Sequence, residues 1–148
     1  MPSKTHRFLS LRFFDRITNH IGLLVEAEFV KLGFKGLTTS HFEILTYLFR
    51  KKEPTNMTKL AEAIERTKPT CTVLVVKLES VGLLVRKVST VDKREWEVNL
   101  SPLAISKKKN FYSVSAKLLS LKTWGLVTEE EKKLYPILEK IYNHIKMP

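Results

Sequence analysis

The sequence predicts a mainly α-helical protein with a small β-hairpin, and three observations favour this α+β fold class. Apolar residues recur at helical spacing through most of the chain. Serine, threonine or proline stands before several of these runs and glycine follows them, as is typical of helix starts and ends. Two runs rich in β-branched or aromatic residues, 85–91 and 96–100, flank a charged turn at 92–95 and predict the hairpin.

Length and composition indicate one compact fold with helical extensions. The chain has 148 residues, and 43% of them are hydrophobic, which is enough to fill a core. The apolar runs are short and interrupted by charged residues, so we expect neither an export signal nor a membrane span. The single cysteine, Cys71, has no internal disulfide partner, which suits a reducing cytoplasm. We therefore expect a cytoplasmic protein.

Charge is the strongest signal in the composition. The formal net charge is +11 and the isoelectric point is about 9.8. Such a surface attracts polyanions through counterion release and long-range steering. Nucleic acid is the first partner to expect, although a basic surface also serves solubility alone.

The N-terminal part of the chain predicts two helices. The first is a long amphipathic helix from residue 8 to about residue 32, and Gly33 and Gly36 end it. The second carries apolar residues at helical spacing between residues 42 and 49. The hydroxyls of Thr38, Thr39 and Ser40 are candidate N-caps for this second helix, and Ser40 and Glu43 have the spacing of a capping box.

The central part predicts a helix-turn-helix followed by a wing. After a polar break, Thr58 is expected to cap a short helix of about two turns. Pro69 then lies in the first turn of another helix, which Gly82 ends. The β-branched residues of this helix favour a strand by propensity, but the helical period and the capping signals outweigh that preference. Together with the preceding helix and the hairpin, this order is that of a winged helix-turn-helix.

The helix that contains Pro69 is the third helix of the winged helix-turn-helix, and it is predicted to read DNA. Its inward stripe begins at Cys71, so the opposite side carries Val73, Val76 and Lys77. Residues near the N-terminus of such a helix meet base edges in the major groove. Threonine there hydrogen-bonds a base or touches a thymine methyl group, whereas valine does only the latter. A half-site that contains thymine is therefore favoured, unless Val73 and Val76 are buried and the DNA-binding face lies elsewhere.

The expected contacts divide into base contacts and phosphate contacts. Base contacts are expected from the exposed side of the third helix, namely from Thr70, Thr72 and Val73. Lys68 and Lys77 are expected to bind phosphates, and the amides at the start of the Thr58 helix another phosphate.

The C-terminal part predicts two further helices. Ser101-Pro102 opens a helix that runs to Gly125. Thr128 and Glu131 have capping-box spacing at the start of the last helix. Pro136 should bend this helix or move its start later.

Four stretches within residues 37–101 resemble the MarR family (multiple antibiotic resistance regulators) of winged-helix transcription factors: LTTSHFEILTYL, MTKLAEAI, TKPTCTVLVVKLESVGLLVRK and VDKREWEVNLS. The most specific part is the family's Asp-x-Arg followed by five residues and Leu-Thr, matched by Asp92, Arg94, Leu100 and Ser101. The chain departs from the family where a glycine commonly follows Leu-Thr, and where Val73 and Val76 replace common polar residues.

The resemblance implies an architecture and a function. Residues 1–36 and 102–148 would form dimerisation helices around a winged helix-turn-helix domain at 37–101. The protein would be a homodimeric DNA-binding regulator, a repressor, on a pseudo-palindromic operator. A small, often anionic aromatic effector would bind between the dimer helices and the winged-helix lobe. Independently of the resemblance, the sequence contains no Gly-rich phosphate loop, nucleophile elbow or other catalytic constellation, so we expect no enzyme activity, no cofactor and no membrane partner.

The resemblance also assigns roles in the wing. Arg94 would enter the minor groove, Asp92 would hold the charged network of the wing, and Lys93 would add a phosphate contact. A narrow A·T-rich minor groove has an enhanced negative potential that attracts arginine, which agrees with this assignment. The alternative is a solvated turn in which Asp92 pairs with Arg94 or with Arg86 and contributes little stability.

Other kinds of site find little support in the sequence. The four histidines have no i, i+4 pair and one cysteine completes no zinc set, so we expect no metal. Some MarR relatives sense oxidants through cysteine, but Cys71 lies on the inward stripe, where it acts as a small hydrophobe. A competing function is a winged-helix adaptor that binds a protein through an apolar patch at Val73 and Val76.

Overall fold

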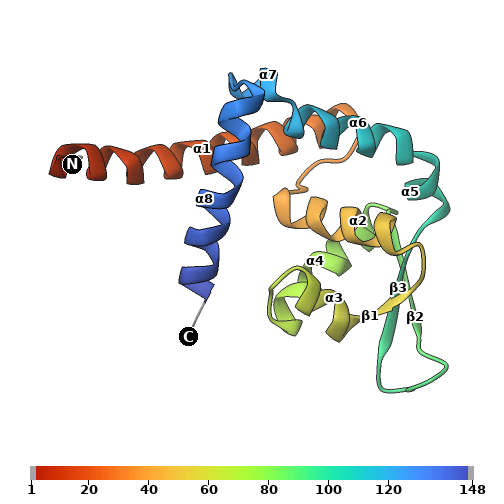
Figure 1. Ribbon diagram of the computed structural model, residues 1–148. Coiled ribbons are helices and arrows are strands. Elements are labelled where there is room, and N and C mark those ends of the chain that lie inside the picture. The colour runs from red at the N-terminus through yellow and green to blue at the C-terminus, as the bar shows by residue number, and fades with distance from the viewer. Residues whose placement is uncertain (1–2, 147–148) are drawn as a thin grey trace. The chain divides into compact units, whose positions relative to one another are not determined.

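The computed structural model describes residues 3–146, apart from the side chains of residues 121 and 122. It consists of two compact units, Met1–Phe111 and Tyr112–Pro148. The first unit contains α1 (Lys4–Lys31), α2 (Thr39–Lys51), β1 (Thr55–Asn56), α3 (Met57–Ala63), α4 (Lys68–Ser80), β2 (Leu84–Val88), β3 (Trp96–Leu100) and α5 (Pro102–Ser106). Helix α6 (Lys108–Leu119) begins in the first unit, and the second unit also contains α7 (Leu121–Trp124) and α8 (Thr128–Lys146). The predicted fold class, a mainly helical winged helix-turn-helix, is confirmed (Figure 1).

The sheet has three antiparallel strands in the order β1-β3-β2. Strands β2 and β3 form the predicted hairpin, with Leu84 opposite Leu100 and Val88 opposite Trp96. Figure 1 shows this hairpin projecting beyond the helices of the first unit as a wing. Strand β1 was not expected from the sequence, and it pairs Thr55 with Val98 on the other side of β3.

The core of the first unit lies among α1, α2, α3, α4 and the base of the wing. Its fully buried side chains include Val25, Leu37, Ile44, Leu45, Leu48, Leu60, Cys71, Val75, Leu78, Leu83, Leu84 and Val98. An aromatic group adds to it: Phe111 lies edge-on to Phe29 and tilted against Phe49, with ring centroids 6.0 and 5.7 Å apart. Phe111 of α6 thereby joins α1 to α2 by apolar contacts.

Of the three hydroxyls that the sequence offers at the start of α2, Thr38 is the cap, whereas the predicted cap of α3 is wrong by two residues. Helix α2 begins after Thr38, whose backbone N–H donates to His41 Nδ1 at 2.9 Å, so Ser40 and Glu43 do not form the expected capping box. Helix α3 begins after Asn56, whose Oδ1 accepts from the backbone N–H of Lys59 at 2.8 Å. Thr58 is therefore inside this helix and does not cap it.

The C-terminal helices also differ from the prediction. Ser101 caps a helix as expected, since its side chain accepts from the N–H of Ala104, but the expected continuous helix to Gly125 is divided into α5, α6 and α7. Helix α8 starts one residue earlier than the predicted capping box, because Glu130 Oε2 accepts from the N–H of Val127 at 2.9 Å. Pro136 lies inside α8 and does not delay its start.

Candidate nucleic-acid interface

Local signals fix both ends of α4. Thr67 caps its start, because Thr67 Oγ1 accepts from the N–H of Thr70 at 3.3 Å, and proline stands in the first turn. At its end the N–H of Gly82 donates to the carbonyl of Glu79, and the N–H of Leu83 donates to the carbonyl of Leu78. This is the Schellman arrangement, and the φ of +81° at Gly82 is one that L side chains rarely adopt.

The outward face of α4 is apolar in its middle. Cys71, Val75 and Leu78 are fully buried, whereas Val73 is 69% exposed and Val76 is 43% exposed. The alternative that Val73 and Val76 are buried against another part of the first unit is therefore wrong. Two valines on one exposed face offer methyl groups to a partner and no hydrogen bond.

The threonines of α4 add methyl groups more than free hydroxyls. Thr72 Oγ1 donates to the carbonyl of Lys68 at 2.9 Å, which uses its hydrogen within the helix. Thr67 Oγ1 donates to Thr70 Oγ1 at 3.0 Å, which leaves the hydrogen of Thr70 available to a partner. Thr70 is exposed and Thr72 is half-buried.

The two lysines of α4 lie in different surroundings. Lys68 Nζ is 3.5 Å from Oε1 of Glu95, which lies in the wing turn. Lys77 is exposed near the other end of the helix, and a side chain at position 36 would meet its Nζ at 3.4 Å. The pKa of His41 is lowered, first by burial and second by the positive charge of Lys77.

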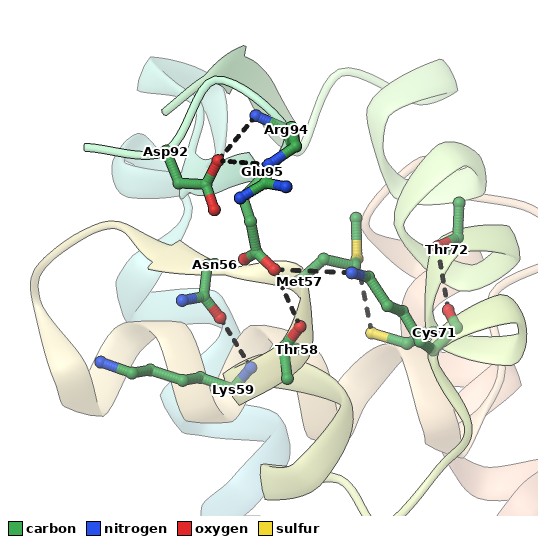
Figure 2. Close-up of polar contacts among 10 residues, drawn as sticks. Asn56, Met57, Thr58, Lys59, Cys71, Thr72, Asp92, Arg94 and Glu95 are labelled. Carbon is green, nitrogen blue, oxygen red and sulfur yellow. Dashed lines mark hydrogen bonds and ion pairs between the residues drawn. The ribbon is translucent and has the colours of Figure 1, made fainter. Parts of the chain in front are cut away.

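The wing turn is held by its own polar groups. Ser89 Oγ accepts from the N–H groups of Val91 and Asp92 at 3.2 and 3.3 Å. Asp92 Oδ1 accepts from Arg94 N at 3.0 Å and lies 3.4 Å from Arg94 Nε, as Figure 2 shows. Asp92 therefore fixes the backbone before Arg94, whose side chain is 92% exposed. Lys93 is exposed beside it.

Arg86 has a different partner from the one considered in the sequence. Its Nε and a terminal nitrogen each donate to Glu79 at 3.1 Å, and its guanidinium lies 5.1 Å from the ring centroid of Trp96. The pairing of Arg86 with Asp92 is therefore wrong. Arg86 connects β2 to the C-terminal end of α4 and so helps to hold the wing on the helix.

Glu95 is a residue of the interface that the sequence did not single out. Thr58 Oγ1 donates to Glu95 Oε1 at 3.2 Å, so the Thr58 hydroxyl faces the wing (Figure 2). The only signal for Glu95 in the sequence is its place at the end of the charged turn, and its partners come from distant segments.

Cys71 lies behind this surface. It is fully buried, and its Sγ lies 3.8 Å from Met57 Sδ. Burial raises the pKa of the Cys71 thiol, which disfavours the reactive thiolate.

Within residues 3–146, no group of three His, Cys, Asp or Glu side chains could hold a metal ion. Among the described helices, none is long and apolar enough to cross a membrane.

Comparison with known proteins identifies this arrangement. The model of the MarR family matches residues 37–96, which contain α2, α3, α4 and the wing turn. We call residues 37–96, which this family model matches, the MarR-family domain. No curated protein sequence matches the chain.

Solved structures resemble the chain beyond the MarR-family domain. A MepR–DNA complex of S. aureus has a TM-score of 0.79 at 22% identity, over 90% of this chain and 96% of that one. AbsC, a MarR family transcriptional regulator from Streptomyces coelicolor, has a TM-score of 0.77 at 18% identity, over 100% and 99%. A MarR transcriptional regulator from Methanosarcina mazei has a TM-score of 0.76 at 16% identity, over 96% and 99%. At these identities, the likeness shows a shared fold.

Proposed function

We propose that the protein is a cytoplasmic, sequence-specific DNA-binding transcriptional regulator that acts as a repressor. Helix α4 would lie in the major groove and the wing in the adjacent minor groove. The observation that carries this proposal is the wing tip, where Asp92 fixes the backbone of Arg94 and the Arg94 side chain is 92% exposed. A narrow minor groove attracts such an arginine through its negative potential. The solved MepR–DNA complex, which shares this fold, supports the same reading.

The charge distribution supports a polyanionic partner. The net charge of +11 favours DNA through counterion release. Lys93 and Arg94 stand at the wing tip, and Lys68 stands at the start of α4, so cations lie at both proposed contact regions. Lys77 would contact a phosphate from the far end of α4. Thr58, whose hydroxyl is bonded to Glu95, would contribute mainly through its backbone.

A homodimer is proposed from apolar residues exposed outside the MarR-family domain. In α1 these are Phe8, Leu11, Phe13, Phe14 and Ile17, and in α8 they are Leu134, Tyr135, Ile137, Leu138, Ile141, Tyr142 and Ile145. Exposed apolar stripes of this length are typical of interaction surfaces. Residues 1–36 and 102–148 would then be dimerisation segments. The MarR-family domains of the two copies would bind half-sites whose centres are about one helical turn apart.

An effector would bind beside the MarR-family domain. A hollow between α1 and the start of α2 is lined by Thr18, Asn19, Gly22, Leu23, Glu26, Thr38, Thr39 and Ser40. The one charged residue among these lining residues is Glu26. Its carboxylate favours a neutral or cationic effector at this place over the anionic one expected from the family. Effector control further requires different affinities for the effector in the DNA-bound and free states.

The test is a fluorescence-anisotropy titration of DNA fragments selected from the genome that encodes the protein, at several salt concentrations. Wild-type protein should bind with strong salt dependence. Arg94→Ala should lower the affinity and reduce the slope of log K against log salt by about one. Salt-independent binding, or binding to no fragment, would contradict the proposal.

A second candidate function is a protein-binding adaptor, and the exposed valines of α4 favour it. Val73 and Val76 would form the centre of an apolar docking surface. DNA affinity that is unchanged by substitutions of Thr70, Val73 and Arg94 would support the adaptor over the regulator.

A further inference from the structure

Glu95 closes the wing turn with its backbone. The N–H of Ser89 donates to the carbonyl of Glu95 at 2.9 Å, and the N–H of Glu95 donates to the carbonyl of Asp92 at 2.9 Å. Glu95 is also the chain neighbour of Arg94. The position of the Glu95 backbone therefore constrains the position of the Arg94 backbone, from which the exposed side chain extends.

The Glu95 side chain connects the wing to two helices. Its Oε1 accepts from Thr58 Oγ1 of α3 at 3.2 Å and lies 3.5 Å from Lys68 Nζ of α4. Figure 2 shows the carboxylate pointing from the wing turn toward Thr58. One carboxylate thus joins the three elements that the proposed function places at DNA.

The second carboxylate oxygen is unusual. Oε2 of Glu95 is buried and has no hydrogen-bond partner among the described residues. Burying a polar atom without a partner costs free energy, and more so on a charged group. The unpartnered Oε2 makes a contribution to folding stability a poor explanation for a glutamate at this position. The contacts of Oε1 with Thr58 and Lys68 explain it better, as a group that holds the wing in place.

We propose that Glu95 is a positioning residue that holds the wing against α3 and α4, so that Arg94 reaches the minor groove while α4 occupies the major groove. The holding contact is a property of the free protein, and its effect on DNA rests on the proposed function. Two effects of removing the carboxylate have opposite signs. Removing a negative charge near phosphates raises DNA affinity, whereas releasing the wing lowers it.

The sign of the change in DNA affinity tests the positioning role. Glu95→Ala should weaken binding about tenfold, within the range of coupled neighbouring residues. Glu95→Gln keeps an oxygen that accepts from Thr58 and should restore most of the affinity. Glu62→Ala is the matched control, because Glu62 is an exposed carboxylate on α3 near the same turn, and its removal should leave binding unchanged or tighter.

A double-mutant cycle identifies the group that Glu95 positions. Arg94→Ala should cost much less affinity in a Glu95→Ala background than in the wild-type background, because the released wing no longer presents Arg94. A merely structural role of Glu95 would leave the loss from Arg94→Ala equal in both backgrounds. Equal losses, or a Glu95→Ala variant that binds DNA more tightly, would overturn the proposal.

Hydrogen exchange on the free protein separates this inference from the proposed function. Amide exchange in the wing turn, residues 89–95, should be faster in Glu95→Ala and in Thr58→Val than in the wild type, with the thermal unfolding midpoint showing that each variant is folded. Unchanged exchange in both variants would overturn the inference. A wild-type protein that binds no DNA would instead contradict the proposed function, while the exchange rates would still decide whether Glu95 holds the wing.

Discussion

His41 links the packing of the MarR-family domain to pH. It is 6% exposed, and its Nδ1 accepts from the backbone N–H of Thr38, which requires an unprotonated nitrogen. Burial, and then the positive charge of Lys77, lower the pKa of His41 below its ordinary value of 6.5. The native state therefore holds His41 neutral where the unfolded chain begins to protonate.

We predict that this histidine makes the protein less stable in mild acid. Because the native pKa is lowered, the native state binds fewer protons than the unfolded state between the two pKa values. The contribution is fully present above about 6.5 and is lost as the pH falls toward the native pKa. His41→Gln preserves an acceptor for Thr38 without titrating, so its stability should fall less between pH 7.5 and 5.5, as measured by urea unfolding. Parallel pH dependences of the two proteins would contradict this assignment.

The limits of sequence reasoning are clearest at single residues. The roles of Asp92 and Arg94 were expected from the family resemblance, and the ion pair between them was considered as an alternative; the pair is present, because the two residues are only two positions apart. The partner of Arg86 was not predicted, since Glu79 meets it only when β2 folds back beside α4. Glu95 was missed for the same reason, because its hydrogen bond to Thr58 spans 37 positions of the chain.

At the scale of elements, strong periodicity was predictive and weak local signals were not. The long helix α1 and helix α4 agree with their apolar period and their glycine ends. Strand β1 has two residues, which is too short to show a period. The break between α5 and α6 falls at Lys107, a residue that carries no helix-ending signal in the sequence.

The exposed face of α4 leads to a prediction about base recognition. Its valines and the engaged hydroxyl of Thr72 offer methyl groups, so the face suits thymine methyl groups in the major groove. Replacing one contacted thymine by deoxyuridine removes only that methyl group and should weaken binding about fourfold, from ~0.8 kcal/mol per buried carbon. Anisotropy titrations on a series of singly substituted half-sites measure the effect.

A matched substitution assigns the methyl contact to α4. Val73→Ala should weaken binding to the thymine half-site and remove most of the further loss caused by deoxyuridine at the contacted position. Val85→Ala, at a half-exposed valine on β2, is the control and should leave the deoxyuridine effect unchanged. Equal sensitivity to deoxyuridine in wild type and Val73→Ala would exclude Val73 as the reader of the methyl group.

At the scale of the whole molecule, two apolar surfaces lie outside the MarR-family domain. One is in the first half of α1, and the other is the α8 stripe that includes Ile137 and Ile141, which are 57% and 42% exposed. Exposing apolar surfaces of this extent to water is unfavourable. A dimer in which a second copy of the chain covers them would therefore be stabilised. Dimerisation would also join two MarR-family domains. Two linked domains bind an operator with two half-sites far more tightly than one domain does.

We therefore predict that oligomeric state and operator affinity change together. Replacing both Ile137 and Ile141 by glutamine should convert the dimer to a monomer in sedimentation-velocity runs. Affinity for a two-half-site operator should fall about a hundredfold, while affinity for an isolated half-site stays constant, because each MarR-family domain is intact. Val127→Gln, at a 61% exposed residue just before α8, is the control and should remain dimeric. If the isoleucine variant stayed dimeric, or lost half-site binding equally, the α8 stripe would not be the surface that couples assembly to DNA binding.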